Sequence, residues 1–244
     1  MKATEYYQII SAQLAEQFEQ SASQITEAAT ACAESIRSGR VIHVFGCGHS
    51  QAFAMEVFYR AGGLVPVNAI LVPHLALFPR SKLSTFQERV EGFARQVLAM
   101  EATDPKDTMI VASISGRNAA PVDMALAAKE VGMTVVALVS RLFADSTTSR
   151  HSSGQNLKDV ADIVIDIKCV AGDAVLSMEG VPEKFCGTST VLGVAVMEAI
   201  IAETVEASVR AGYVPPTWVS SNLDRGDAIN DRHISNYSAM ISCL

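Results

Sequence analysis

Short apolar runs alternate with longer stretches of helical periodicity along most of the chain. Five runs rich in aliphatic residues have the length of strands that are buried on both faces. They are residues 41–45, 64–68, 109–112, 134–139 and 161–167. Between several of them, apolar residues recur every three or four positions, which predicts helices. This alternation predicts an α/β fold, a doubly wound parallel sheet that binds ligands at the carboxyl ends of its strands.

The helical stretches differ in length. Residues 4–38, rich in Ala, Gln and Glu, predict a helical N-terminal extension of two helices with a break near Ser21–Ser23. Further helices are predicted from Ser50 to about Gly62, over 85–100, over 119–131, and from Thr188 to about Arg210.

Polar segments interrupt this pattern in the second half of the chain. Residues 141–159 and 172–187 predict long loops, and long loops in a compact domain are usually functional or mobile. The last segment is polar and turn-rich. We therefore expect one domain over residues 1–244, with N-terminal helices (1–38), an αβα core (41–210) and a polar tail (211–244).

Composition narrows the class of protein. The 244 residues are 49% hydrophobic, enough for a full core, and the net charge of −7 without a Lys/Arg cluster argues against a nucleic-acid partner. Five scattered cysteines form no Cys-x-x-Cys pair, which fits a reducing cytoplasm and indicates no zinc site. The N-terminus lacks the apolar core of a signal peptide, and no later run is long enough for a membrane span. We expect a cytoplasmic protein with no membrane partner.

A glycine turn follows the first predicted strand. Gly46 and Gly48 bracket the sharp bend, and His49 and Ser50 lead into the next helix. Unpaired backbone N–H groups and the positive end of the helix dipole then point at one spot. The turn therefore predicts an anion site, although a tight turn without a ligand would have the same residues.

Two common anion-binding motifs do not match this turn. A dinucleotide motif needs a third glycine where Gln51 stands, and an acidic residue after the strand at 64–68, which has none. A P-loop needs Lys-Ser/Thr after Gly48, where His49 and Ser50 stand. A hydroxyl and an imidazole suit a small phosphorylated or polyhydroxylated ligand better than a nucleotide.

A second glycine turn follows the strand at 109–112. Ser113, Ser115, Gly116 and Asn118 surround the point where the next helix starts. Several short donors and the N–H groups of a helix start can enclose a phosphate dianion. The alternative is an ordinary Ser/Asn-rich helix cap.

The two turns together, Gly-Cys-Gly-His-Ser at 46–50 and Ser-Ile-Ser-Gly-Arg-Asn at 113–118, resemble the signature turns of the sugar isomerase (SIS) phosphosugar-binding domain. The resemblance covers about residues 22–210 and extends to a bacterial group of SIS proteins that carry the name phosphoheptose isomerase. It implies an αβα sandwich, a phosphosugar ligand, no metal or cofactor, and a homodimer or larger assembly with the N-terminal helices in the interface. It also implies that Ser113, Ser115, Gly116 and Asn118 bind the phosphate, with Gly48 and Ser50 against the same ligand. The family usually has Ser or Thr where this chain has Asn118, which weakens the transfer at that position.

The resemblance also implies candidate catalytic residues. In one branch of the family a glutamate base precedes a Ser/Thr-rich helix start, and Glu183 ahead of Thr188 matches that placement. In phosphoheptose isomerases the base instead lies ten residues after the first-turn serine, where this chain has Arg60; Glu56 lies one turn earlier on the same predicted helix. His49 beside Ser50 is a candidate proton donor for ring opening.

Two functions follow and stay open at this point. The first is an aldose–ketose isomerase, in which a carboxylate moves a proton between adjacent sugar carbons through an enediol. The second is a non-catalytic module that binds a phosphosugar and reports its level. The sequence does not specify which phosphosugar binds, nor the roles of Glu56, His151, Asp224 and His233.

Overall fold

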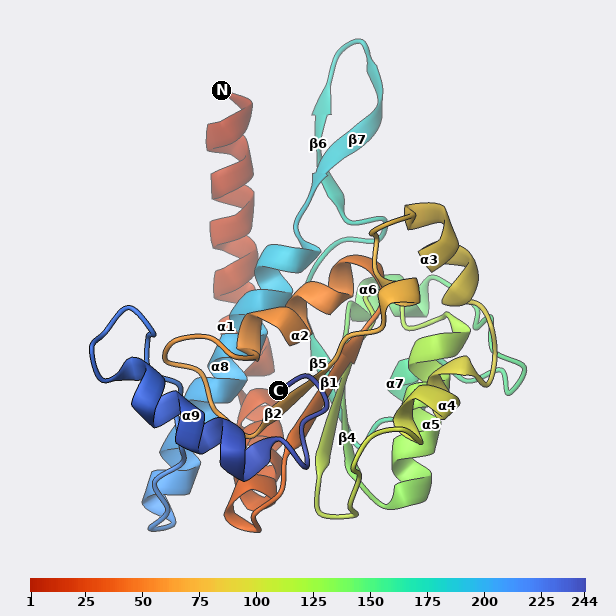
Figure 1. Ribbon diagram of the computed structural model, residues 1–244. Coiled ribbons are helices and arrows are strands. Elements are labelled where there is room, and N and C mark those ends of the chain that lie inside the picture. The colour runs from red at the N-terminus through yellow and green to blue at the C-terminus, as the bar shows by residue number, and fades with distance from the viewer.

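The computed structural model describes residues 1–244 and is built around a five-stranded parallel sheet (Figure 1). The strands are β1 (Ile42–Gly46), β2 (Val67–Ile70), β3 (Thr108–Ala112), β4 (Thr134–Val139) and β5 (Ile163–Asp166). Their order in the sheet is β2-β1-β3-β4-β5, and all four pairings are parallel. The predicted doubly wound α/β fold is confirmed, with β2 about three residues later than predicted.

Helices cover both faces of this sheet and create two cores. On one face lie α1 (Lys2–Arg37), α2 (Gln51–Val57) and α8 (Ser189–Arg210), and on the other α4 (Phe93–Leu98), α5 (Ala119–Val131) and α7 (Leu157–Val160). Alternate residues of β3 serve the two cores: Ile110 packs into the first, and Met109 and Val111 pack into the second. None of the helices combines the length and the apolar character that crossing a membrane requires.

The N-terminal extension is one continuous helix, so the predicted break near Ser21–Ser23 is wrong. Ser21, where the break was predicted, faces inward, as does Gln17 one turn earlier, and both bind backbone carbonyls at the end of β5. Ser21 Oγ donates to the Asp166 carbonyl (2.9 Å), and Gln17 Nε2 donates to the Ile167 carbonyl (2.9 Å). Because these carbonyls satisfy the buried polar groups, the helix continues through a polar stretch.

Two predicted helices are shorter than their patterns suggested. After Gly48–Ser50, which form a short 3-10 turn (η1), α2 ends at Val57, because Phe58 is extended and Tyr59 has a φ of 47°. The stretch 85–100 contains the end of α3 (Ser81–Gln87) and all of α4 rather than one helix. Gly92, with a φ of 80°, lies directly before α4 in a left-handed conformation that glycine adopts at little cost.

The predicted loop at 172–187 is an antiparallel hairpin, β6 (Ala174–Met178) and β7 (Val181–Gly187). The hairpin projects from the body beside the N-terminal part of α1, and the Tyr6 hydroxyl donates to the Gly187 carbonyl at its base (2.7 Å; Figure 1). Glu183 therefore lies on an exposed strand, not in a loop before α8. Most residues of β7 are exposed, so its sequence has no hydrophobic alternation that would predict a strand.

The segments predicted as polar loop and tail also contain helices. Within 141–159 lie α6 (Arg141–Asp145) and the start of α7, and the tail contains α9 (Gly226–Tyr237). Beyond α9 the chain returns to the sheet, where Ser242 Oγ donates to Glu101 (3.2 Å).

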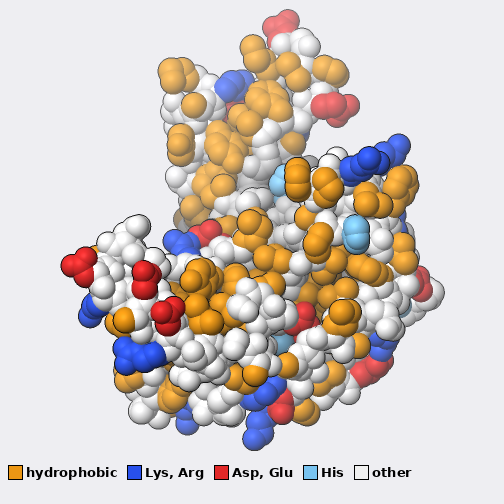
Figure 2. All heavy atoms as spheres, in the orientation of Figure 1, with side chains coloured by type: hydrophobic (Ala, Val, Ile, Leu, Met, Phe, Trp, Pro, Cys, Tyr) orange, Lys and Arg blue, Asp and Glu red, His pale blue; other side chains and the backbone are white.

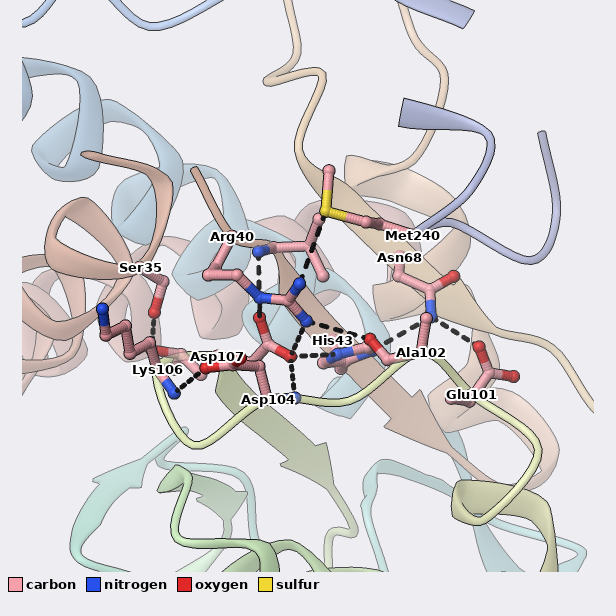
Figure 3. A network of polar contacts seen from close by, with 12 residues as sticks. Ser35, Arg40, His43, Asn68, Glu101, Ala102, Asp104, Lys106, Asp107 and Met240 are labelled. Carbon is pink, nitrogen blue, oxygen red and sulfur yellow. Dashed lines mark hydrogen bonds and ion pairs between the residues drawn. The ribbon is translucent and has the colours of Figure 1, made fainter. Parts of the chain in front are cut away.

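A buried polar network holds the amino ends of β1, β2 and β3 together (Figure 3). Asp107 accepts hydrogen bonds from Arg40 Nε (3.0 Å) and Nη2 (3.0 Å) and lies 3.2 Å from His43 Nε2. Asn68 Nδ2 bridges His43 Nδ1 (3.0 Å) and Glu101 (2.8 Å). Burial favours a higher pKa for Asp107, but the bonds from His43 and Arg40 outweigh it and lower that pKa.

Candidate functional site

The two glycine turns lie next to each other at the carboxyl edge of the sheet. The first turn (residues 46–50) follows β1 and the second turn (residues 113–118) follows β3, and these strands pair in parallel with Gly46 opposite Ala112. From β1 the chain proceeds to β2 on one side, and β3 lies on the other side. The turns thus flank the topological switch point, where open α/β sheets form their ligand crevice.

The first turn is shaped by close backbone contacts. A Cβ on Gly46 would overlap the carbonyl group of Ser50, so only glycine fits there. Gly48 has a φ of 58°, and the Ser50 N–H donates back to the Cys47 carbonyl (3.0 Å). Ser50 is buried by this bend, whereas the His49 side chain is exposed at the sheet edge.

The second turn is held by its neighbours through backbone atoms. Gly116 has a φ of 63°, and a Cβ there would overlap the Asn156 amide. Asn156 Nδ2 donates to the Ser115 carbonyl (3.1 Å), and the Leu157 N–H donates to the Gly116 carbonyl (2.9 Å). The capping box that starts α7 therefore also fixes the shape of this turn.

Several donors of the second turn have no acceptor within the chain. The N–H groups of Ser115, Arg117, Asn118 and Ala119 make no backbone hydrogen bond. The turn's own hydrogen bonds use carbonyls, so the hydroxyls of Ser113 and Ser115 stay available. Asn118 precedes α5 but its side chain makes no cap; its amide oxygen accepts from Arg150 Nη1 (2.8 Å). Unpaired donors around a helix start are what a phosphate group requires.

A cavity of about 460 Å³ opens beside both turns. Its lining residues come from the first turn, the second turn, the hairpin and the start of α8; they are His49, Ile114, Asp173, Gly187, Ser189 and Thr190. Asp173 accepts from the N–H groups of Thr188 (2.8 Å) and Ser189 (2.7 Å) and from the Ser189 hydroxyl (2.7 Å). A carboxylate of the chain itself thus occupies the positive end of α8.

The structure does not bring Glu183 to this cavity. It is exposed on β7 and is not among the residues that line the cavity beside His49. The neighbouring Lys184 lines a larger cavity of about 660 Å³, between the N-terminal half of α1 and the hairpin, which contains no predicted site residue. The carboxylate at the start of α8 is Asp173. The only sequence signal for it was its place after Gly172, at the beginning of the polar segment.

Sequence reasoning also missed Glu88, a half-buried carboxyl group between the two turns. Burial raises its pKa, against the opposing effects of the Asn118 amide, Arg89 and Arg150. Burial, and then the charge of Glu88, raise the pKa of the Cys47 thiol in the first turn. Glu88 lies in the stretch 85–100, which the sequence predicts as a helix, and no local pattern marks it as different from a surface carboxylate.

The residues whose roles the sequence left open lie outside the cavity. Glu56 on α2 forms an ion pair with Arg60, which lies beyond the end of the helix. His151 lies 3.2 Å from Asp123 in a mostly buried pair. His233 packs edge-on against Trp218, with ring centroids 5.8 Å apart. Asp224 is exposed in the loop before α9.

Structural comparison finds this fold in two proteins described as phosphoheptose isomerases. A phosphoheptose isomerase from Francisella tularensis matches with a TM-score of 0.55 and 18% identity, over 84% of this chain and 97% of that one. A phosphoheptose isomerase from Neisseria gonorrhoeae matches with a TM-score of 0.52 and 16% identity, over 82% and 95% of the two chains. At these identities the similarity shows a shared fold.

Sequence comparison identifies the family. The family model described as SIS domain matches residues 5–140. A UPF0309 protein of Geobacillus kaustophilus is 40% identical over 240 residues, 98% of this chain and 96% of that protein. A UPF0309 protein of Listeria monocytogenes is 42% identical over 220 residues, 90% and 89% of the two chains. The chain therefore belongs to the SIS domain family and, within it, to the UPF0309 proteins.

Proposed function

We propose that this protein binds a phosphosugar in the cavity beside the two turns, with the phosphate on the second turn. One observation carries the proposal: at the topological switch point, several hydrogen-bond donors lack an acceptor within the protein. They are the hydroxyls of Ser113 and Ser115 and four N–H groups between Ser115 and Ala119. Membership of the SIS family and a fold shared with two phosphoheptose isomerases support it. In this proposal Gly48, Ser50, Gly116 and Asn118 complete the phosphate surroundings.

The chemistry that we assign to the bound sugar is aldose–ketose isomerisation through an enediol. A base must remove a proton from one sugar carbon and return it to the next, while a proton donor assists ring opening. His49 lines the cavity and takes the role of donor. Glu183 takes the role of base, which requires the β6–β7 hairpin to bend towards the cavity when the ligand binds.

A non-catalytic phosphosugar sensor is the second candidate. Asp173 is the carboxylate that lines the cavity, and three hydrogen bonds from the start of α8 already engage it. A site without a free base in its unliganded form suits binding alone. This observation favours the sensor, whereas the exposed imidazole of His49 favours the enzyme.

A panel of phosphosugars tested by thermal shift examines the binding proposal. A ligand at 100 times its dissociation constant is expected to stabilise the protein by about 2.7 kcal/mol. The double variant Ser113→Ala/Ser115→Ala should lose this stabilisation while remaining folded. Ser23→Ala/Ser238→Ala, which changes two exposed hydroxyls elsewhere, is the matched control. Unchanged affinity in the Ser113/Ser115 variant would remove the assignment.

Proton exchange separates the enzyme from the sensor. In heavy water, an isomerase should introduce solvent deuterium into the bound phosphosugar, and Glu183→Gln should abolish this exchange. Lys184→Gln, the neighbouring position on β7, is the control and should retain it. Binding without deuterium incorporation by the wild type would favour the sensor. Exchange that persists in Glu183→Gln would show that another group is the base.

We also propose that the protein is a homodimer or larger assembly. Tyr7 and Phe18 lie on one side of α1, eleven positions apart, and are 72% and 75% exposed. Hydrophobic side chains gather on the two projecting elements, the N-terminal part of α1 and the β6–β7 hairpin (Figure 2). Exposed apolar surface of this kind marks an interface. Light scattering that gave a 26.0 kDa particle at micromolar concentration would refute the proposal.

A further inference from the structure

Three arginines from separate segments lie near one another at the second turn. Arg89 follows α3, Arg117 belongs to the turn, and Arg150 lies between α6 and α7. The Arg150 N–H donates to the Arg117 carbonyl (2.7 Å), and Arg117 Nε donates to the Thr148 carbonyl (2.9 Å). None of the three forms a salt bridge. The arginines thus cluster in a protein whose net charge is −7.

The clustering has an electrostatic cost that the chain itself does not neutralise. Partial desolvation, and then the charges of Arg117 and Arg89, lower the pKa of Arg150. Glu88 is the carboxyl group whose charge acts favourably on Arg150, and its own pKa is raised by burial. Glu88 is acted on by Arg89 and Arg150, and Arg117 adds a third positive charge beside Arg150, so the cluster keeps an excess of positive charge.

The other nearby carboxylates are committed to different partners. Glu91 accepts from the Ser152 N–H (2.7 Å) and hydroxyl (2.6 Å). Asp123 accepts from the Gly92 N–H (2.6 Å) and pairs with His151 (3.2 Å). These contacts clamp the segment that carries Arg150 against α5 and the α3–α4 connection. The cluster is therefore held in place, and the same contacts prevent Glu91 and Asp123 from pairing with it.

The position of the cluster indicates what it binds. Guanidinium groups recognise phosphates and carboxylates through paired hydrogen bonds. Arg117 belongs to the turn whose free donors suit one phosphate, and Asn118, which precedes α5, is bonded to Arg150. We propose that Arg89, Arg117 and Arg150 bind the second anionic group of a sugar that carries two, either a second phosphate or a carboxylate besides the phosphate. The inference rests on the proposed function, because it assumes a phosphosugar on the second turn.

Calorimetric titration with three probes tests this inference. Fructose 6-phosphate carries one anionic group, fructose 1,6-bisphosphate carries two phosphates, and 6-phosphogluconate carries a phosphate and a carboxylate. The wild type should bind at least one doubly anionic probe about tenfold more tightly than fructose 6-phosphate, since charge-assisted bonds are added. Whichever doubly anionic probe binds more tightly identifies the second group.

The variant Arg89→Gln/Arg150→Gln should lose this preference and leave affinity for fructose 6-phosphate within about twofold. Arg37→Gln/Arg225→Gln removes two exposed positive charges elsewhere and should retain the preference. Equal affinity of the wild type for all three probes, or a preference that persists in Arg89→Gln/Arg150→Gln, would overturn the inference alone. If no probe binds, or if binding survives Ser113→Ala/Ser115→Ala, the proposed function fails with it.

Discussion

The two ends of the sheet use similar polar residues in opposite ways. At the amino edge, His43 is fully buried. Arg40, Asp107 and Asn68 surround it in a network of hydrogen bonds that are 2.8–3.2 Å long. At the carboxyl edge, His49 is exposed and several donors of the second turn have no acceptor within the chain. Polar groups that satisfy one another stabilise a fold, whereas groups arranged around a space and left unsatisfied are available to a ligand.

This contrast warns against reading function from residue type alone. The buried pair of His43 and Asp107, with Arg40 beside it, has the composition of a catalytic site. It lies at the amino edge, away from the cavity, and holds the ends of the strands together (Figure 3). The turns at the carboxyl edge contain serines and glycines that would pass as helix caps. The unpaired donors of these turns distinguish a binding site from an ordinary helix cap, and whether a donor is unpaired depends on where the backbone atoms lie.

The largest expected effect comes from Asp107→Ala at the amino edge. The change leaves the Arg40 guanidinium, the His43 ring and the Val41 N–H without their shared acceptor in a buried site. We expect a loss of about 3 kcal/mol in the free energy of unfolding, measured with urea. Asp231→Ala, an exposed change on α9, should cost little. A similar cost for both variants would show that the network does not stabilise the fold.

The pH dependence of stability sharpens the same prediction. The pKa of Asp107 is lower in the folded protein than its unfolded value of about 3.9. Its contribution is therefore complete above about pH 3.9 and is lost as pH falls through the folded-state pKa. Urea unfolding at stepped acidic pH should show a steeper loss for the wild type than for Asp107→Asn. Parallel curves would contradict the assigned pKa direction.

A smaller effect is expected from Gly116→Ala at the carboxyl edge. Its φ of 63° disfavours a side chain, and the new Cβ would overlap the Asn156 amide that holds the turn. We expect about 2 kcal/mol of destabilisation together with weaker phosphosugar binding. Gly39→Ala shares the left-handed backbone, with a φ of 74°, but no atom lies within 4 Å of its Cβ position. The difference between the two variants measures the clash with Asn156.

The smallest stability effect is expected from Ser113→Ala/Ser115→Ala. Because neither hydroxyl bonds to the protein, its removal should change the free energy of unfolding by less than about 0.5 kcal/mol. A loss above about 1 kcal/mol would show that these hydroxyls support the fold as the amino-edge network does. The comparison between the two edges would then fail.

Local sequence patterns were sufficient for the elements that position the site. Aliphatic runs identified β1, β3 and β4, because strands buried on both faces need little else. The glycines of both turns mark where the backbone bends, and α5 has the predicted bounds. Together with the alternation of strands and helices, these signals predict that both turns lie at the carboxyl edge of the sheet.

Contacts between distant residues decided what local patterns did not. The continuity of α1 depends on carbonyls about 145–150 positions away, and the start of α8 is met by Asp173 rather than Glu183 because of how the hairpin folds. Arg117 and Arg150 lie together because the segment before α7 is held against α5 and the α3–α4 connection. Periodicity records which face of an element is buried, whereas the partner that a polar side chain meets depends on how the elements pack.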